Sequence, residues 1–309
     1  MNKADLIELA DNPQFISGIY NYCDRWCERC PFTSRCFLYA TEQADPDLDD
    51  PEVHDINNAK FWRKLEQIFK QTHKMIADWA REAGVDLEAI DVEETLAERE
   101  QLRNEAKGHE LSLSARRYAE MVQEWFKDEF AVDQNVHNDA APEALEEDVN
   151  VTDAVDVIHW YQFFIAAKLY RGLMGREDDM ERGSQPTPGS QRPSAAGVEA
   201  GQLDWGTVRE GAADEIFPGP EPDEDEEYDA ELEAVQNDSN GSVKVALIAI
   251  DRSLSAWRIL QTSLPEKADT IVPMLVELER LRHATEAYFP NARDFIRPGF
   301  DEVNTEFAS

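Results

Sequence analysis

All four cysteines of this 309-residue chain lie within fourteen residues, and this cluster constrains the fold more than any other feature. They are Cys23, Cys27, Cys30 and Cys36, with the spacing C-x3-C-x2-C-x5-C. Four thiolates so close in sequence are typical of tetrahedral zinc sites and iron–sulfur clusters, which prefer soft sulfur donors. Two disulfides would need an oxidising compartment, and unpaired buried thiols have no reason to gather beside charged residues. The sequence therefore predicts a metal centre held by these four residues.

An N-terminal helix is predicted to lead into the cysteines, with Asn12 as its N-cap and Pro13 as its first residue. If this helix continued straight, the Cα atoms of Cys23 and Cys30 would lie about 10 Å apart along its axis. That separation is too large for one zinc ion, whose bonds to sulfur are about 2.3 Å long, whereas a four-iron cluster accepts a wider spacing. The chain should therefore loosen between Cys23 and Cys30, and Pro31 disfavours helical geometry at Cys30. A [4Fe-4S] cluster is the preferred cofactor and Zn2+ the alternative.

Residues Cys27 to Cys36, with the pattern C-x2-C-P-x4-C, form a motif of their own. This motif resembles the segments that hold auxiliary four-iron clusters in the C-terminal domains of radical-SAM maturases. The resemblance covers ten residues and implies a four-iron cluster as the cofactor. Cys23, Cys27 and Cys30 also match the spacing of the radical-SAM cluster loop, but that loop belongs to a β/α barrel and uses three cysteines. This chain has no such pattern of strands and supplies a fourth cysteine close by, so we reject radical-SAM chemistry.

The formal net charge of −35 is extreme for a chain of this length. It repels nucleic-acid phosphates and anionic membranes, so neither is an expected partner. Solvation is the simpler consequence of this charge, and a basic protein is the partner that it would attract. The N-terminus lacks the pattern of a signal peptide, and the longest apolar runs are too short to cross a bilayer. We therefore expect a cytoplasmic protein, while its oligomeric state is left open.

Apolar residues recur at helical spacing along most of the chain, and no credible run of alternating residues is present. The expected fold is all-α, a bundle of about five helices with a long disordered acidic linker. The most apolar helix, at about 155–174, should be central. Trp205 and Phe217 interrupt the linker, which we interpret as passive rather than docked. The predicted organisation is an N-terminal helix and cysteine segment at 1–57, the first part of the bundle at 58–180, the linker at 181–238, a helical hairpin at 239–292 that completes the bundle, and a tail at 293–309.

A second metal site is conceivable at Asp156 and His159, one turn apart on the apolar helix. Di-iron bundles use two Glu-x-x-His motifs, and this chain supplies only this Asp-x-x-His variant. A buried, hydrogen-bonded pair is therefore the simpler interpretation. No nucleotide-binding glycine loop, nucleophile elbow or His-Glu-x-x-His motif is present, so the sequence leaves enzymatic activity open.

Three functions follow from these patterns. The leading hypothesis is a cytoplasmic helical protein that binds a [4Fe-4S] cluster for a structural, redox-sensing or electron-transfer role. The second is a structural four-thiolate zinc protein that acts as an interaction module. The third is a metalloenzyme with its site at Asp156 and His159.

Overall fold

The computed structural model describes residues 9–10, 12–45, 47, 50–87, 92–130, 149–182 and 234–301. In these ranges the chain is helical and contains no strand, as the sequence predicts. The α-helices are α2 (Phe37–Gln43), α3 (Pro51–His54), α4 (Ala59–Ala83), α5 (Val92–Gly108), α6 (Glu110–Phe130), α7 (Val149–Arg182), α9 (Asp238–Ser263) and α10 (Ala268–Tyr288). Short 3-10 turns complete the list: η1 (Ile19–Asn21), η2 (Cys27–Arg29), η3 (Thr33–Arg35), η5 (Pro265–Lys267) and η6 (Ala292–Asp294).

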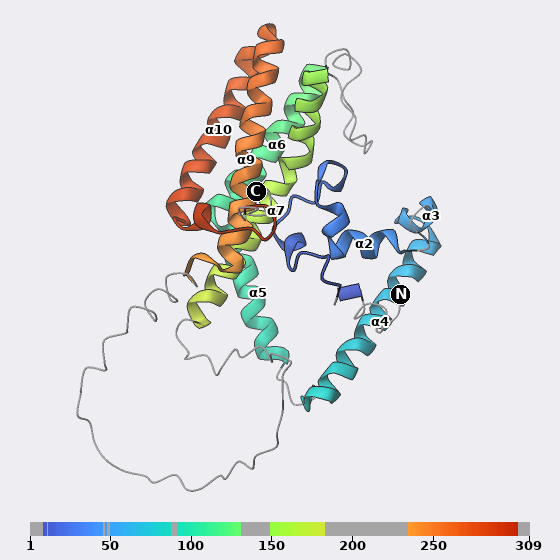
Figure 1. Cartoon of the computed structure of the whole chain (residues 1–309). Coiled ribbons are helices and arrows are strands. Elements are labelled where there is room, and N and C mark those ends of the chain that lie inside the picture. The colour runs from blue at the N-terminus through green and yellow to red at the C-terminus, as the bar shows by residue number, and fades with distance from the viewer. Residues whose placement is uncertain are drawn as a thin grey trace, which may run out of the picture.

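Helices α5, α6, α7, α9 and α10 pack into one bundle (Figure 1). The pair α7 and α9 forms its centre, and α6 and α10 pack against this pair and against each other. The central position of α7 agrees with its expected hydrophobicity. The buried side chains of the core include Tyr118, Val122, Ile158, Tyr161, Ile165, Leu169, Leu247, Ile250, Trp257, Leu260, Ile271 and Leu278. Helices α9 and α10 form the expected hairpin, because only a short turn around Pro265 separates them.

The sequence predicts a helix from about Asn58 to Ala83, ended by Gly84, and α4 has these ends but not the predicted place. Asn58 caps its N-terminus, since the side-chain oxygen accepts a hydrogen bond from the backbone N–H of Lys60, and Gly84 ends it in the left-handed conformation. The sequence places this helix in the bundle, but it lies away from the bundle, and its main contact within the described residues is with α3 (Figure 1). That expectation was wrong. Helical periodicity shows that an apolar face exists and does not show what covers it.

The helix predicted to begin at Pro13 is absent from the described residues. Asn12 Oδ1 does accept a hydrogen bond from the backbone N–H of Gln14, at 3.0 Å, but a turn follows instead of a helix. Gly18 then takes a left-handed conformation with φ 74°, which an α-helix cannot continue through. The segment from there to Cys36 consists of the three 3-10 turns η1, η2 and η3.

Other segments can be compared with their predicted structure only in part. Residues 86–107, expected as a short acidic helix or a connector, contain α5, which packs on α7. The supposed tail after 293 is ordered as far as Asp301 and folds back towards the cysteine segment. The sequence predicts a polar loop at 131–150, of which residues 131–148 lie outside the described residues, and so do residues 183–233 of the acidic linker, with Trp205 and Phe217. No helix in the described ranges combines the length and hydrophobicity needed to cross a membrane.

Candidate metal centre

The four cysteines line one small pocket, although they come from different turns of the segment. Cys23 lies just after η1, Cys27 opens η2, Cys30 ends η2 and Cys36 caps α2. The pocket is small, with a volume of about 20 Å³, which is room for about one water molecule. Its remaining walls are largely aromatic and aliphatic, from Ile19, Tyr20, Trp26, Phe32, Tyr39 and Phe300. The side chains must therefore move apart slightly before this pocket can hold a multi-atom group.

Two sharp turns bring the cysteines to this pocket. The backbone N–H of Cys30 donates to the carbonyl of Cys27 at 3.1 Å, and the N–H of Cys36 donates to the carbonyl of Thr33 at 3.2 Å. Cys30 itself is extended, with φ −86° and ψ 123°, which is the conformation that a following proline favours. Between Cys23 and Cys30 the only regular element is the 3-10 turn η2, so no α-helix runs through the cysteines. Arg25 also helps to bring the cysteines together, because its φ of 61° turns the chain sharply between Cys23 and Cys27.

Two of the sulfur atoms already accept backbone hydrogen bonds. The N–H of Phe32 donates to Cys30 Sγ at 3.4 Å, and the N–H of Tyr39 donates to Cys36 Sγ at 3.5 Å. Such bonds stabilise negative charge on sulfur, which a metal-bound thiolate carries. Cys23 instead donates its S–H to the carbonyl of Tyr20, at 3.5 Å, and would have to give up this bond on binding a metal.

Burial opposes the ionisation of the other two thiols. It raises the pKa of Cys23, against opposing effects from a backbone hydrogen bond of Arg25 and from the charge of Lys168. Burial also raises the pKa of Cys27, and nearby Arg25 opposes this shift. Both thiols are therefore protonated at neutral pH in the absence of metal, so that binding would release protons.

The spacing of the thiols tests which group they could hold. Within the described ranges, no three histidine, cysteine or acidic side chains lie close enough together for a single metal ion. A zinc ion needs four sulfurs about 2.3 Å from one point, whereas a four-iron cluster holds its four ligands further apart. The donor set itself, four sulfurs in an apolar pocket with backbone N–H donors, suits an iron–sulfur cluster.

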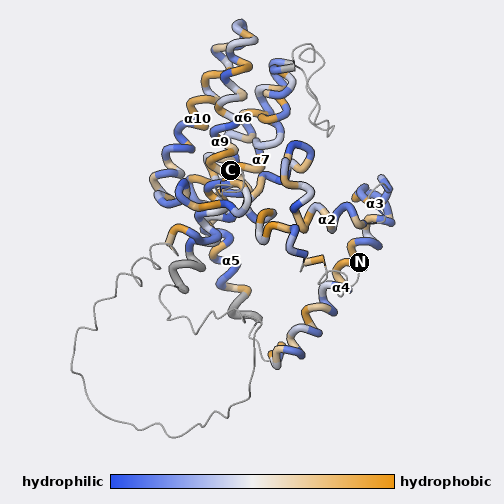
Figure 2. Tube along the Cα trace, in the orientation of Figure 1, coloured by the Kyte–Doolittle hydropathy of each residue, from blue (hydrophilic) through white to orange (hydrophobic). Residues whose placement is uncertain are grey.

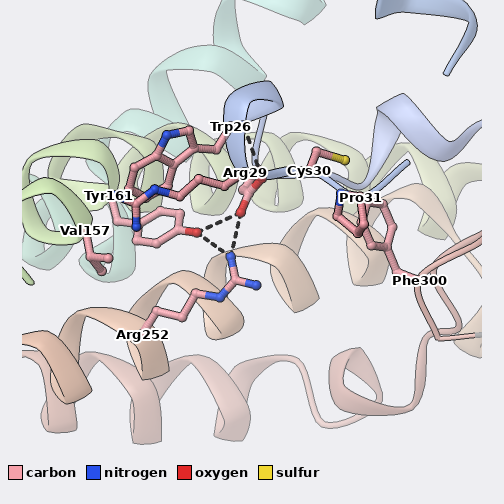
Figure 3. A pocket seen from close by; sticks show the side chains of 9 residues that line it. Trp26, Arg29, Cys30, Pro31, Val157, Tyr161, Arg252 and Phe300 are labelled. Carbon is pink, nitrogen blue, oxygen red and sulfur yellow. Dashed lines mark hydrogen bonds and ion pairs between the residues drawn. The ribbon is translucent and has the colours of Figure 1, made fainter. Parts of the chain in front are cut away.

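Asp24 attaches the cysteine segment to the bundle through Tyr161 and Arg252, whose polar groups point toward each other in Figure 3. Its Oδ2 accepts hydrogen bonds from the hydroxyl of Tyr161 at 2.7 Å and from Nη1 of Arg252 at 2.6 Å. Its backbone carbonyl accepts a hydrogen bond from the indole N–H of Trp160 at 3.0 Å. The residue directly after Cys23 is thereby connected to both α7 and α9. Beside these groups lies a second pocket of about 230 Å³, which shares Asp24 and Cys30 with the cysteine pocket.

Trp26 supplies the apolar part of the same attachment. Its ring stacks on Trp160 of α7 with centroids 5.0 Å apart and planes at 15°, and the guanidinium carbon of Arg29 lies 3.8 Å from the centroid of the Trp26 ring. Arg29 also forms ion pairs with Asp153 and Asp156 of α7. Stacking and cation–π contacts of this kind add to the stability that burial provides.

The proposed second site at Asp156 and His159 takes a different form in the structure. Oδ2 of Asp156 accepts a hydrogen bond from Nη2 of Arg29 at 3.1 Å, and the half-buried ring of His159 packs on Phe126 with centroids 4.4 Å apart. Asp156 thus holds the cysteine segment on α7. A metal at this pair stays a prediction that the geometry does not favour.

The C-terminal residues cover the other side of the cysteine segment. Phe300 packs edge-to-face on Phe32 with centroids 5.1 Å apart, and it lines both pockets. Gly299 has φ 75°, and a Cβ there would lie 2.8 Å from Cδ1 of Ile16. Only glycine fits this close, left-handed turn without strain.

A second close approach joins the segment to α9. The ring of Tyr22 crosses the helix at Gly241, where a Cβ would lie 2.3 Å from Cε1 of the ring. The ring also packs on Phe295, with centroids 4.6 Å apart. The missing side chain at Gly241 therefore creates the place for Tyr22 next to Cys23.

Replacing Asp301 by asparagine is expected to loosen this C-terminal cover. Burial alone would raise the pKa of Asp301, but hydrogen bonds from Arg297 and Lys244 outweigh it and hold the pKa far below its usual range. The carboxylate therefore contributes stability above its unfolded pKa of about 3.9, and this contribution is lost as pH falls towards the depressed value. We expect Asp301→Asn to cost about 1–3 kcal/mol near neutral pH, because it weakens charge-assisted hydrogen bonds.

Thermal unfolding measured across pH tests this expectation. The difference between the wild type and Asp301→Asn should shrink as pH falls below about 4. Asp294→Asn, at an exposed position of the same segment, is the control and should leave the melting temperature unchanged. An equal effect of the two variants would contradict the role of Asp301.

The four cysteines could be identified from the sequence, but the groups that position them could not. Asp24 and Trp26 lie inside the motif, where they look like ordinary spacer residues, and Tyr161 and Arg252 are remote in sequence. One signal was present: Phe295 and Phe300 are aromatic residues in an otherwise polar C-terminal stretch, which suggests that this stretch is packed against something. Their partners could not have been inferred without the fold.

Comparisons of this chain with protein families, with curated proteins and with solved structures gave no match. The assignment of a function therefore depends on the residues and geometry described above.

Proposed function

We propose that this protein binds a [4Fe-4S] cluster through Cys23, Cys27, Cys30 and Cys36. The observation that carries this proposal is that all four cysteines of the chain line one pocket. When bound, such a cluster supplies a one-electron redox couple. The apolar walls and the N–H donors from Phe32 and Tyr39 suit thiolate sulfur.

The position of the pocket favours a redox role over a purely structural one. All four cysteines are only partly buried, and the segment forms an outer layer on α7 and α9. A group held there would lie near the surface. Electron exchange with another molecule requires the redox group to be in such a position. The bundle has its own continuous core of buried apolar side chains, so it does not need a metal to hold its helices together.

The remaining features fit the same proposal. The cysteines require a reducing compartment, which the cytoplasm provides. The net charge of −35 would attract a basic redox partner and would make that association weaker as salt increases.

Purification without oxygen tests the proposal directly. The wild-type protein is expected to be brown, with a broad visible absorption band that bleaches on reduction, and to contain about four iron and four sulfide per chain. A colourless protein with one equivalent of zinc would overturn the cluster and favour the structural zinc site. A protein that takes up neither metal, even after reconstitution with iron and sulfide, would overturn both.

A further inference from the structure

Helix α4 carries a long apolar face that the described elements leave mostly uncovered, since only its N-terminal end lies against α3. Trp62, Phe69 and Trp79 are 55%, 63% and 60% exposed, and every residue from 66 to 76 is exposed. Hydrophobic residues recur along the whole helix (Figure 2). The three aromatic side chains alone leave about 300–400 Å² in water, taking about 150–250 Å² for each complete side chain. Exposed apolar patches of this size mark interaction sites.

The spacing of this face is that of a coiled coil. Apolar or small residues alternate at intervals of three and four over the helix: Trp62, Leu65, Phe69, Thr72, Ile76, Trp79 and Ala83. Three heptads of this kind favour packing along a second helix rather than into a compact groove. The helix has 25 residues and is therefore about 37 Å long, since each residue adds about 1.5 Å.

These seven residues form a seam, and this seam is complementary to itself when two copies of the helix run antiparallel. With a twofold axis passing between residues 70 and 71, Trp62 lies opposite Trp79 of the second copy and Leu65 lies opposite Ile76. The same axis places Phe69 opposite Thr72, where the small side chain leaves room for the ring. Beside this seam, Glu66 comes near His73 of the other copy, so a carboxylate meets a group that can donate a hydrogen bond. Such a pairing is isologous and closes as a dimer.

Charge argues against an anionic membrane as the occupant. The helix has six basic side chains, which at first suggests a membrane-surface helix. Four of the six already form ion pairs with carboxylates of this chain: Lys60 with Asp50 and Glu52, Lys64 with Asp45 and Asp47, Lys70 with Glu66, and Arg81 with Asp78. The remainder of the chain is strongly acidic and would be repelled by anionic lipid.

We infer that α4 is a dimerisation helix, and that two copies of this chain pair antiparallel along its apolar face. Dimerisation through α4 does not depend on the metal at the cysteines. An unusual salt dependence is expected: two chains of net charge −35 repel each other, so added salt should strengthen the dimer. Added salt would instead weaken the association of this chain with a basic partner.

The oligomeric mass of the full chain in solution tests the inference. At micromolar concentration and high salt, light scattering should give twice the chain mass of 35.2 kDa. Phe69→Glu should give a monomer with unchanged helix content and melting temperature, because α4 is not part of the bundle core. Gln67→Glu adds the same charge on the opposite side of the helix and should stay dimeric.

A mixing experiment tests the antiparallel register. Thr72→Lys, like Phe69→Glu, should be monomeric alone, but an equimolar mixture of the two should form a heterodimer. In the antiparallel pair the carboxylate introduced at position 69 of one chain faces the ammonium introduced at position 72 of the other. The symmetry-related contact, between Thr72 of the first chain and Phe69 of the second, stays as in the wild type. A parallel pair would place position 69 opposite itself and allow no such rescue. A monomeric wild type, or a dimer that Phe69→Glu leaves intact, would overturn the inference.

Discussion

Replacing Cys36 by serine is expected to abolish the visible absorption and most of the bound iron and sulfide of anaerobically purified protein. Serine has nearly the same size but does not offer a soft sulfur donor. The substitution should also lower the melting temperature, since a group that binds only the folded protein adds its binding free energy to the free energy of folding. For a domain of about 150–250 residues, each kcal/mol lost lowers the melting temperature by about 2–4 °C. We expect a decrease of several degrees relative to the loaded wild type.

The remaining cysteines and a control within the segment make this test specific. Cys23, Cys27 and Cys30 should behave like Cys36 if all four are ligands. Ser34→Ala, which removes an exposed hydroxyl inside the same segment, should keep the colour and the melting temperature. The apo forms of the wild type and Cys36→Ser should melt together, because the difference arises only from the bound group. A variant that keeps both iron and colour would remove that cysteine from the proposed ligand set.

Replacing Trp257 by alanine is expected to destabilise the bundle by about 3–5 kcal/mol, the range for loss of a large buried aromatic side chain. Trp257 is fully buried in α9, its ring packs edge-to-face on Trp125 with centroids 5.0 Å apart, and its indole N–H donates to the hydroxyl of Tyr118 at 2.9 Å. The substitution would leave a cavity and would also leave the Tyr118 hydroxyl without this donor. Domains of this kind are stable by only about 5–15 kcal/mol, so much of the total would be lost.

Chemical denaturation followed by circular dichroism measures this change. Ile259→Ala removes a 39% exposed side chain from the same helix and should cost less than about 1 kcal/mol. If the two substitutions destabilised the protein equally, the face of α9 that carries Trp257 would not be its buried face. Because the cysteine segment is attached to α7 and α9, partial unfolding of Trp257→Ala should also reduce metal retention.

Helix boundaries followed closely from the sequence where capping residues marked them. Asn58 and Gly84 bracket α4, and Pro265 separates α9 from α10. The N-terminal segment was the main error, since its apolar stripe suggested a helix. The left-handed Gly18 and Arg25 make turns there instead. Periodicity could not reveal these turns, because it records which residues are apolar and not which backbone conformations the packed chain selects.

By itself, the sequence determined that the chain is helical, that its most apolar helix is central, and that four thiols are available within one short segment. These properties depend on local spacing, capping and composition, which act between residues close together in the chain. Only the tertiary structure decided that Asp24 would be connected to Tyr161 and Arg252, that Phe300 would cover the cysteines, and that α4 would be left outside the core. These outcomes depend on contacts between residues that are far apart in the chain, and hydrophobic burial is non-directional, so an apolar face alone does not specify its partner.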